Sequence, residues 1–168
     1  ASEDIAADNA GKVDYKRPVK YMLYYLLITY LVMVVSIDMP FLLGKYGYDS
    51  AVSGYVTSLF FIAMMIPGLF INRIIAVLRG GILIFSLLLI ALGLFDVYFN
   101  DSLIFIIFGC VATGVGYGIA QPYIYDVTAS LAPPQKSTYA LALLMTMNYV
   151  AILVSPFFVD WMQELFGI

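Results

Sequence analysis

Asp38 is the one acidic residue that lies clearly inside a long apolar run, in the stretch YLVMVVSIDMPFLL. A carboxyl group is costly to place in hydrocarbon, so it must face protein or water and is a candidate functional residue. A carboxyl that gains and loses a proton could carry protons, and an ionised carboxylate could bind a cationic group. The alternative is that Asp38-Met39-Pro40 marks the place where a helix breaks within reach of water. Both interpretations are open.

Apolar runs long enough to cross a bilayer make up most of the chain. Of its 168 residues, 63% are hydrophobic and 11% are charged, and the mean hydropathy is +0.97. Soluble domains carry about 25% charged residues. A spanning helix needs about 20 apolar residues, so the predicted fold is an all-α polytopic membrane protein. Residues 1–20 form a polar lead-in and residues 21–168 a bundle, with predicted spans at 21–43, 54–72, 80–98, 103–125 and 139–160.

The basic residues indicate how the bundle is oriented. One side of the predicted spans receives all the lysines and arginines except Lys45: Lys12, Lys16, Arg17, Lys20, Arg73, Arg79 and Lys136. Because basic loops stay on the cytoplasmic side, we expect a cytoplasmic N-terminus. The expected setting is the inner membrane of a bacterium, with lipid as a partner of the bundle.

Composition excludes several classes of function. A net charge of -3 with scattered basic residues offers no patch for nucleic acid. The chain has no histidine and one cysteine, Cys110, so neither a Cys/His metal site nor an internal disulfide is expected. No converging acid pair or nucleophile and base is evident, so we expect no enzyme activity and no cofactor.

The stretch IPGLFINRIIAVLRGG, residues 66–81, combines glycines with basic residues between two apolar runs. It resembles the signature loop of the major facilitator superfamily of secondary transporters, which follows the pattern G-x-x-x-D-R-x-G-R-R. Gly68 and Arg73 match, Asn72 stands at the position of the aspartate, and Arg79 is the remaining basic residue. The resemblance implies that Arg73 helps to gate the cytoplasmic ends of the helices. The alternative is that Arg73 and Arg79 only anchor the loop at lipid headgroups.

A second stretch, GVGYGIAQPYIYDVTASLAPPQKSTYALALLMTMNYV at 114–150, resembles the tenth helix, the following loop and the eleventh helix of this family. The order of the spans then implies helices seven to eleven, which are most of the C-terminal six-helix half. The chain would be a fragment whose partners are the N-terminal half and helix twelve. The resemblance also implies transport by alternating access and a peripheral third span, which is apolar all round and expected to face lipid.

Polar side chains occur in the first, second, fourth and fifth spans but hardly in the third, which indicates that these four spans face a cavity or other helices. The candidate cavity-lining residues are Tyr30, Gln121, Asn148 and Tyr149. Ordinary hydrogen bonding between helices is the alternative for each of them. Gly114 and Gly118 have the G-x-x-x-G spacing that permits close packing of helices.

Two functions fit these observations. The first is part of a secondary active transporter for a small polar solute, either neutral or cationic, since no lysine or arginine lies within a predicted span. The second is a natural small membrane subunit with an assembly or regulatory role, which would bind other membrane helices through its glycine-rich span.

Overall fold

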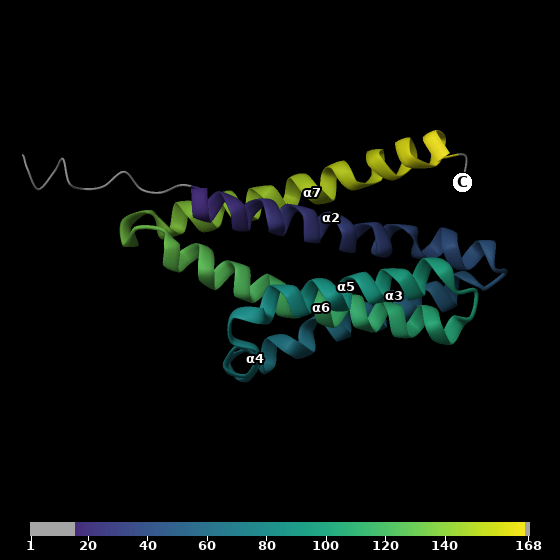
Figure 1. The fold of residues 1–168 in the computed structure, drawn as a ribbon. Coiled ribbons are helices and arrows are strands. Elements are labelled where there is room, and N and C mark those ends of the chain that lie inside the picture. Colours follow the sequence, from purple (N-terminus) through teal and green to yellow (C-terminus); the bar gives the residue numbers. More distant parts are fainter. Residues whose placement is uncertain (1–15, 167–168) are drawn as a thin grey trace, which may run out of the picture.

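The computed structural model describes residues 16–166, and all of its regular elements are helical. In chain order these are α2 (Lys16–Lys45), α3 (Ser50–Leu69), α4 (Ile71–Leu78), η1 (Arg79–Gly81), α5 (Ile82–Phe99), α6 (Leu103–Leu131), η2 (Pro134–Lys136) and α7 (Ser137–Phe166). Within the described range no strand occurs. The long helices run lengthwise through one elongated bundle (Figure 1).

Five of these helices are long and apolar enough to cross a membrane, which confirms the predicted all-α polytopic fold. The first helix, α2, begins at Lys16, inside the stretch predicted as a polar lead-in, and residues 1–15 lie outside the described residues. The fourth long helix, α6, continues to Leu131, past the predicted end of its span. The interior proline Pro122 does not end it, since neighbouring groups can compensate for the hydrogen bond that proline removes.

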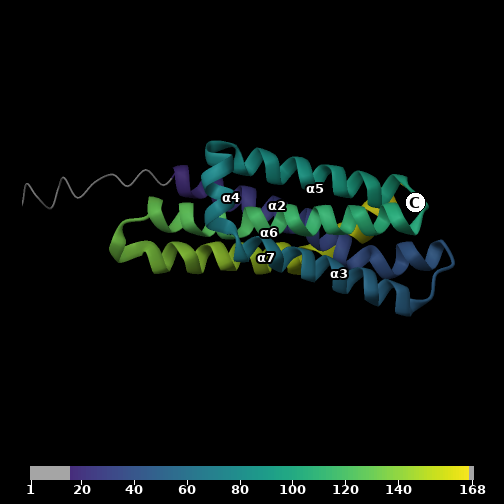
Figure 2. The same cartoon turned by 90° about the horizontal axis from the view of Figure 1, so that it is seen from below.

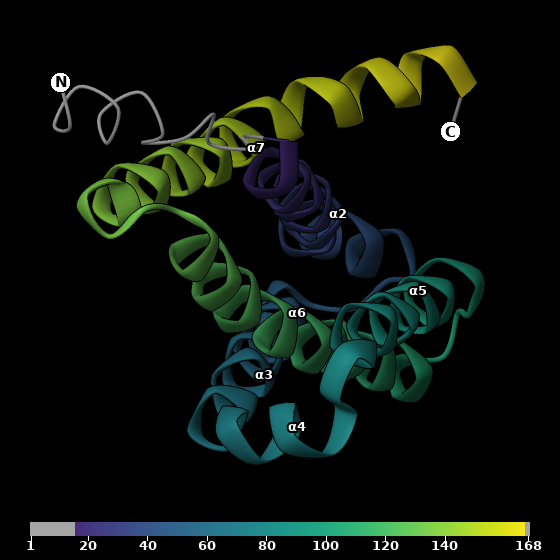
Figure 3. The same cartoon turned by 60° about the vertical axis from the view of Figure 1, so that its left-hand side comes forward.

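The connection between α3 and α5 contains a helix, α4, where the sequence predicted a loop. α4 has eight residues, of which Ile71, Ile74, Ile75 and Leu78 are half-buried. Their spacing of three and four residues places them on one face of a helix, and this face explains why the segment is helical. α4 ends at Leu78, and the next residue, Arg79, has a positive φ of 45°. In Figure 2, α4 crosses between the end of α3 and the start of α5, short of the connection from α6 to α7, and Figure 3 shows it at the edge of the bundle beside α3 and α5.

One end of the bundle carries the basic side chains of Lys20, Arg73, Arg79 and Lys136, and we name it the basic end. The first turns of α2, helix α4 and the connection from α6 to α7 all lie there (Figure 1). The opposite end carries Lys45 and the turns from α2 to α3 and from α5 to α6.

Helix α6 lies at the centre of the bundle, with contacts to α2, α3, α5 and α7. In the apolar part of α6, 56% is buried within the structure, whereas in the span that includes α5 the buried share is 17%. α5 is therefore the most exposed span, but it is not exposed all round as expected. One stripe of α5 is buried, and its members are Ile82, Ser86, Ile90, Gly93 and Val97. The expectation was wrong on this stripe because apolar residues pack against protein as readily as against lipid.

Glycines allow α6 to approach two of its neighbours closely. A Cβ atom on Gly109 would lie 2.5 Å from the carbonyl oxygen of Gly93 on α5, and one on Gly114 would lie 2.6 Å from the carbonyl oxygen of Phe60 on α3. A Cβ atom on Gly118 would overlap the backbone of Met64. The predicted packing role of Gly114 and Gly118 thus corresponds to the contact of α6 with α3.

Candidate functional site

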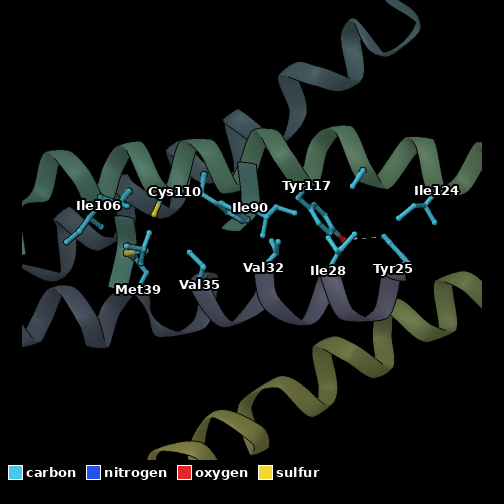
Figure 4. Close-up of a cluster of buried hydrophobic side chains, with 14 of the residues drawn as sticks. Tyr25, Ile28, Val32, Val35, Met39, Ile90, Ile106, Cys110, Tyr117 and Ile124 are labelled. Carbon is cyan, nitrogen blue, oxygen red and sulfur yellow. Dashed lines mark hydrogen bonds between the residues drawn. The ribbon is translucent and has the colours of Figure 1, made fainter. Parts of the chain in front are cut away.

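Polar side chains of α2, α6 and α7 meet inside the bundle in what we name the tyrosine cluster, defined as Tyr25, Thr29, Tyr117, Tyr125 and Asn148. The Tyr117 hydroxyl lies 3.2 Å from Thr29 Oγ1, 3.3 Å from the Tyr25 hydroxyl and 3.4 Å from Asn148 Oδ1. The Tyr25 hydroxyl in turn donates to the Tyr125 hydroxyl at 3.5 Å. Figure 4 shows Tyr25 and Tyr117 reaching toward each other from α2 and α6.

The rings of the cluster pack as well as hydrogen-bond. Tyr25 and Tyr117 are stacked with ring centroids 6.3 Å apart, and Tyr125 meets Tyr25 edge-on at 5.5 Å. Tyr25, Thr29 and Tyr117 are buried, whereas Tyr125 and Asn148 are half-buried. The cluster therefore extends from a partly open edge on α6 and α7 into the interior of the bundle.

Helical spacing explains why these residues converge. On α6, Tyr117, Gln121 and Tyr125 are four residues apart and form one stripe, and on α2, Tyr25 and Thr29 have the same spacing. Helix α7 contacts both α2 and α6, and this position brings Asn148 within reach of Tyr117.

The tyrosine cluster is suited to recognising hydrogen-bonding groups without charge. Each hydroxyl carries one proton and can also accept. Tyr117 has hydrogen-bonding distances to Tyr25, Thr29 and Asn148 but can donate to only one group at a time. Its partners can therefore be exchanged, and the half-buried Tyr125 and Asn148 can offer a donor or acceptor to a ligand at the open edge.

Asp38 lies in a second polar region, toward the Lys45 end. The Tyr98 hydroxyl of α5 donates to Asp38 Oδ2 at 3.2 Å, and Asp38 is half-buried. This hydrogen bond gives the Asp38 carboxyl group a protein neighbour on α5. Beyond the spans at the same end, the Asp101 carboxylate accepts a hydrogen bond from Tyr46, and this bond raises the pKa of Tyr46.

The other predicted site residues are dispersed. Gln121 is half-buried beside the tyrosine cluster, whereas Tyr149 is 69% exposed and takes no part in it. Tyr30 is half-buried, directly follows Thr29 on α2 and lies eight residues before Asp38. The loop residues Gly68, Asn72, Arg73 and Arg79 are all exposed at the basic end.

Sequence reasoning did not identify Tyr25, Thr29, Tyr117 and Tyr125 as site residues, nor Tyr98 as the partner of Asp38. The repeated spacing of four along α6 could have indicated that Tyr117, Gln121 and Tyr125 share a face. No local pattern could have paired them with α2, because Tyr25 and Tyr117 are 92 residues apart.

Comparisons with curated proteins and with solved structures found no significant match. The family model of the Major Facilitator Superfamily, in contrast, matches residues 16–168, a range that includes the five long helices, the tyrosine cluster and Asp38. The family match and the five apolar helices both indicate an integral, multi-pass membrane protein whose general role is transport. The chain therefore belongs to the Major Facilitator Superfamily.

Proposed function

We propose that the chain is part of a secondary active transporter that moves a small polar solute by alternating access. The observation that carries this proposal is the family match over residues 16–168. In such transporters the solute binds near the middle of the bilayer, between two groups of helices that rock against each other. We further propose that the present spans correspond to helices seven to eleven, so that the complete transporter would also contain an N-terminal half and helix twelve.

The open edge of the tyrosine cluster is the proposed solute contact, with Gln121, Tyr125 and Asn148 as the contacting residues. All three are half-buried and uncharged. The buried hydroxyls of Tyr25, Thr29 and Tyr117 support them from behind through the hydrogen bonds of the cluster. A neutral solute, or a cationic one held against the tyrosine rings, suits these groups best.

Asp38 is proposed to couple transport to protons. It lies within a span and accepts a hydrogen bond from Tyr98, so a change in its protonation would weaken or strengthen a contact between α2 and α5. Such a contact gives a proton a way to bias the arrangement of two helices. The Lys45 end, toward which Asp38 lies, would face away from the cytoplasm.

The basic end is proposed to be cytoplasmic, with the protein in the inner membrane of a bacterium. The support is the concentration of Lys20, Arg73, Arg79 and Lys136 at that end. In the gating role, Arg73 and Asn72 would contact the neighbouring half of the transporter in one conformation and release it in the other. Both side chains are exposed and accessible to such a partner.

Uptake by the complete transporter in proteoliposomes tests the proposal. A panel of radiolabelled sugars, amino acids and amines is offered with and without an imposed proton gradient, and gradient-driven accumulation of at least one solute is expected. Asn148→Ala and Gln121→Ala should reduce that accumulation, whereas Tyr139→Phe, at an exposed position on α7, should not. Absence of any accumulation, together with a stable complex with another membrane protein, would favour the alternative of an assembly or regulatory subunit.

A further inference from the structure

The hydrogen bonds of the tyrosine cluster have a direction, from buried donors to half-buried acceptors. An amide oxygen accepts hydrogen bonds but cannot donate them, so the contact of 3.4 Å between the Tyr117 hydroxyl and Asn148 Oδ1 requires Tyr117 as the donor. The Tyr25 hydroxyl likewise donates to the Tyr125 hydroxyl at 3.5 Å. In both contacts the proton comes from a buried residue, and the residue that accepts it is half-buried.

The buried part of the cluster supplies these protons in sequence. Tyr117 has one proton, which it donates either to Asn148 or to the Tyr25 hydroxyl at 3.3 Å. Because Tyr117 is the donor in both contacts, its contact with Thr29 Oγ1 at 3.2 Å requires Thr29 to donate. A chain of hydrogen bonds thus runs from Thr29 through Tyr117 and Tyr25 to Tyr125. Bonds that point the same way polarise one another and strengthen the donor at the end of the chain.

The half-buried end of this chain is left with unused donors. Tyr125 accepts from Tyr25 and keeps its own proton, and Asn148 accepts at Oδ1 and keeps the two protons of its amide nitrogen. Within the described part of the chain, no hydrogen bond uses these protons. Gln121 lies four residues before Tyr125 on the same stripe of α6 and can turn either end of its amide toward a ligand.

Charged solutes are poorly matched to such an edge. An ammonium group only donates, so it would meet other donors at Tyr125 and Asn148. The ring faces of Tyr25 and Tyr117, which could attract a cation, are stacked on each other, and these residues are only 0% and 3% exposed. An anion could accept from the donors, but residues 21–44, 103–131 and 137–166 contain no lysine or arginine to balance its charge.

We propose that the open edge of the tyrosine cluster selects a neutral solute through its acceptor oxygens, such as the carbonyl oxygen of an amide or a ketone. Tyr125 and Asn148 donate to the solute, and Tyr25, Thr29 and Tyr117 are positioning residues that hold these donors outward. Three hydrogen bonds of 3.3 to 3.5 Å connect Tyr125 to Asn148, so one small solute can reach both. The inference rests on the proposed transport function and narrows its solute to the neutral class.

Saturation-transfer NMR on the complete transporter in nanodiscs tests the proposal with two matched probes. N-methylpyrrolidone is neutral and only accepts hydrogen bonds, whereas N-methylpyrrolidinium is a cation of the same ring size that only donates. The wild type should bind N-methylpyrrolidone in preference, and Tyr125→Phe should weaken this binding roughly fivefold, the scale of one hydrogen bond. Tyr139→Phe, at an exposed position on α7, is the matched control and should have no effect. Equal binding of the probes, preference for the cation or absence of N-methylpyrrolidone binding overturns the proposal.

Asn148→Asp tests the direction of the hydrogen bonds. A carboxylate can still accept from Tyr117, but it offers negatively charged acceptors in place of the amide protons, so the preference should reverse toward N-methylpyrrolidinium. An unchanged preference in the folded variant overturns the proposal, and if this variant does not fold, Tyr125→Phe alone decides. Uptake in proteoliposomes separates the two proposals. Absence of any gradient-driven accumulation contradicts the transport function, whereas accumulation of amines in preference to neutral solutes contradicts only the selection of acceptors.

Discussion

Helix α6 packs against its neighbours in two different ways. Toward α3 and α5 the contacts are between backbones, and a Cβ atom would meet neighbouring atoms at each of the contact glycines Gly93, Gly109, Gly114, Gly116 and Gly118. Toward α2 and α7 the polar contacts are between the side chains of the tyrosine cluster, at 3.2 to 3.5 Å. Backbone contacts of this kind tolerate little movement, whereas hydroxyl groups can exchange partners.

This difference indicates that the two sides of α6 differ in how far the neighbouring helices can move. We infer that α3, α5 and α6 behave as one rigid unit and that α2 and α7 are the helices able to shift against it. Hydrogen bonds between membrane helices contribute about 0.6 kcal/mol each on average, so few of them need to break for such a shift. Overpacking a tight helix contact costs roughly 1–3 kcal/mol or more.

The largest expected effect on stability is therefore at the glycine contacts of α6 with α3 and α5. Gly118→Leu places a side chain against the backbone of Met64, and we expect the free energy of unfolding to fall by about 3 kcal/mol or more. Unfolding followed by steric trapping in bicelles measures this change. Gly54→Leu is the matched control, since Gly54 lies in α3 with nothing within 4 Å of its Cβ position, and a change of about 0.5 kcal/mol or less is expected there. Equal losses at both positions would show that the glycine contacts are not the rigid side of α6.

Asp38→Asn should have the next largest effect, on coupling and not on folding. An amide can still accept a hydrogen bond from Tyr98 but cannot bind and release a proton, so proton-dependent uptake should be abolished while solute exchange persists. Uptake and counterflow in proteoliposomes distinguish the two activities. Tyr98→Phe, which removes the donor at 3.2 Å and leaves the carboxyl, should retain proton-driven uptake at a reduced rate. Unchanged pH dependence in Asp38→Asn would refute the coupling role.

The long helices could be predicted from sequence because hydropathy is a local property. Runs of about 20 apolar residues determine a span wherever they occur, and the glycine spacing at Gly114 and Gly118 likewise indicates a close contact from one segment alone. Helix α4 was not predicted because its apolar face covers only two turns, at Ile71, Ile74, Ile75 and Leu78. The arginines beside this face are typical of a loop between two spans.

The candidate site was predictable only in part, because it depends on how the helices are rotated about their axes. Asn148 and Gln121 were expected to line a cavity, and both lie at or beside the tyrosine cluster, yet Tyr149 is adjacent to Asn148 and points away. Tyr117 looked like an ordinary member of a glycine-rich run. Its position at the centre of the cluster follows from contacts with α2 and α7, which no single segment contains.

A smaller effect is expected at the centre of the tyrosine cluster. Tyr117→Phe removes the hydroxyl that links Tyr25, Thr29 and Asn148 and keeps the ring stacked on Tyr25. The free energy of unfolding should fall by about 1 kcal/mol, on the scale of one or two such hydrogen bonds, while solute uptake falls several-fold because Asn148 loses its support. Tyr139→Phe, at an exposed tyrosine on α7, is the control. A loss of stability as large as that of Gly118→Leu would mean that the cluster is as rigid as the glycine contacts.

The smallest expected effect on function comes from a cysteine-labelling experiment on α5, which tests whether α5 belongs to the rigid unit. Single cysteines on α5, introduced in a Cys110→Ala background, are offered a lipid-phase thiol reagent. Positions 88, 92 and 95, which are exposed, should be labelled, whereas positions 86, 90 and 97 in the buried stripe should be protected. Transport should be unchanged by the exposed substitutions. If positions in the stripe are labelled as fast as exposed ones, α5 separates from α6 in the membrane, and the movable boundary lies between these two helices instead of at the tyrosine cluster.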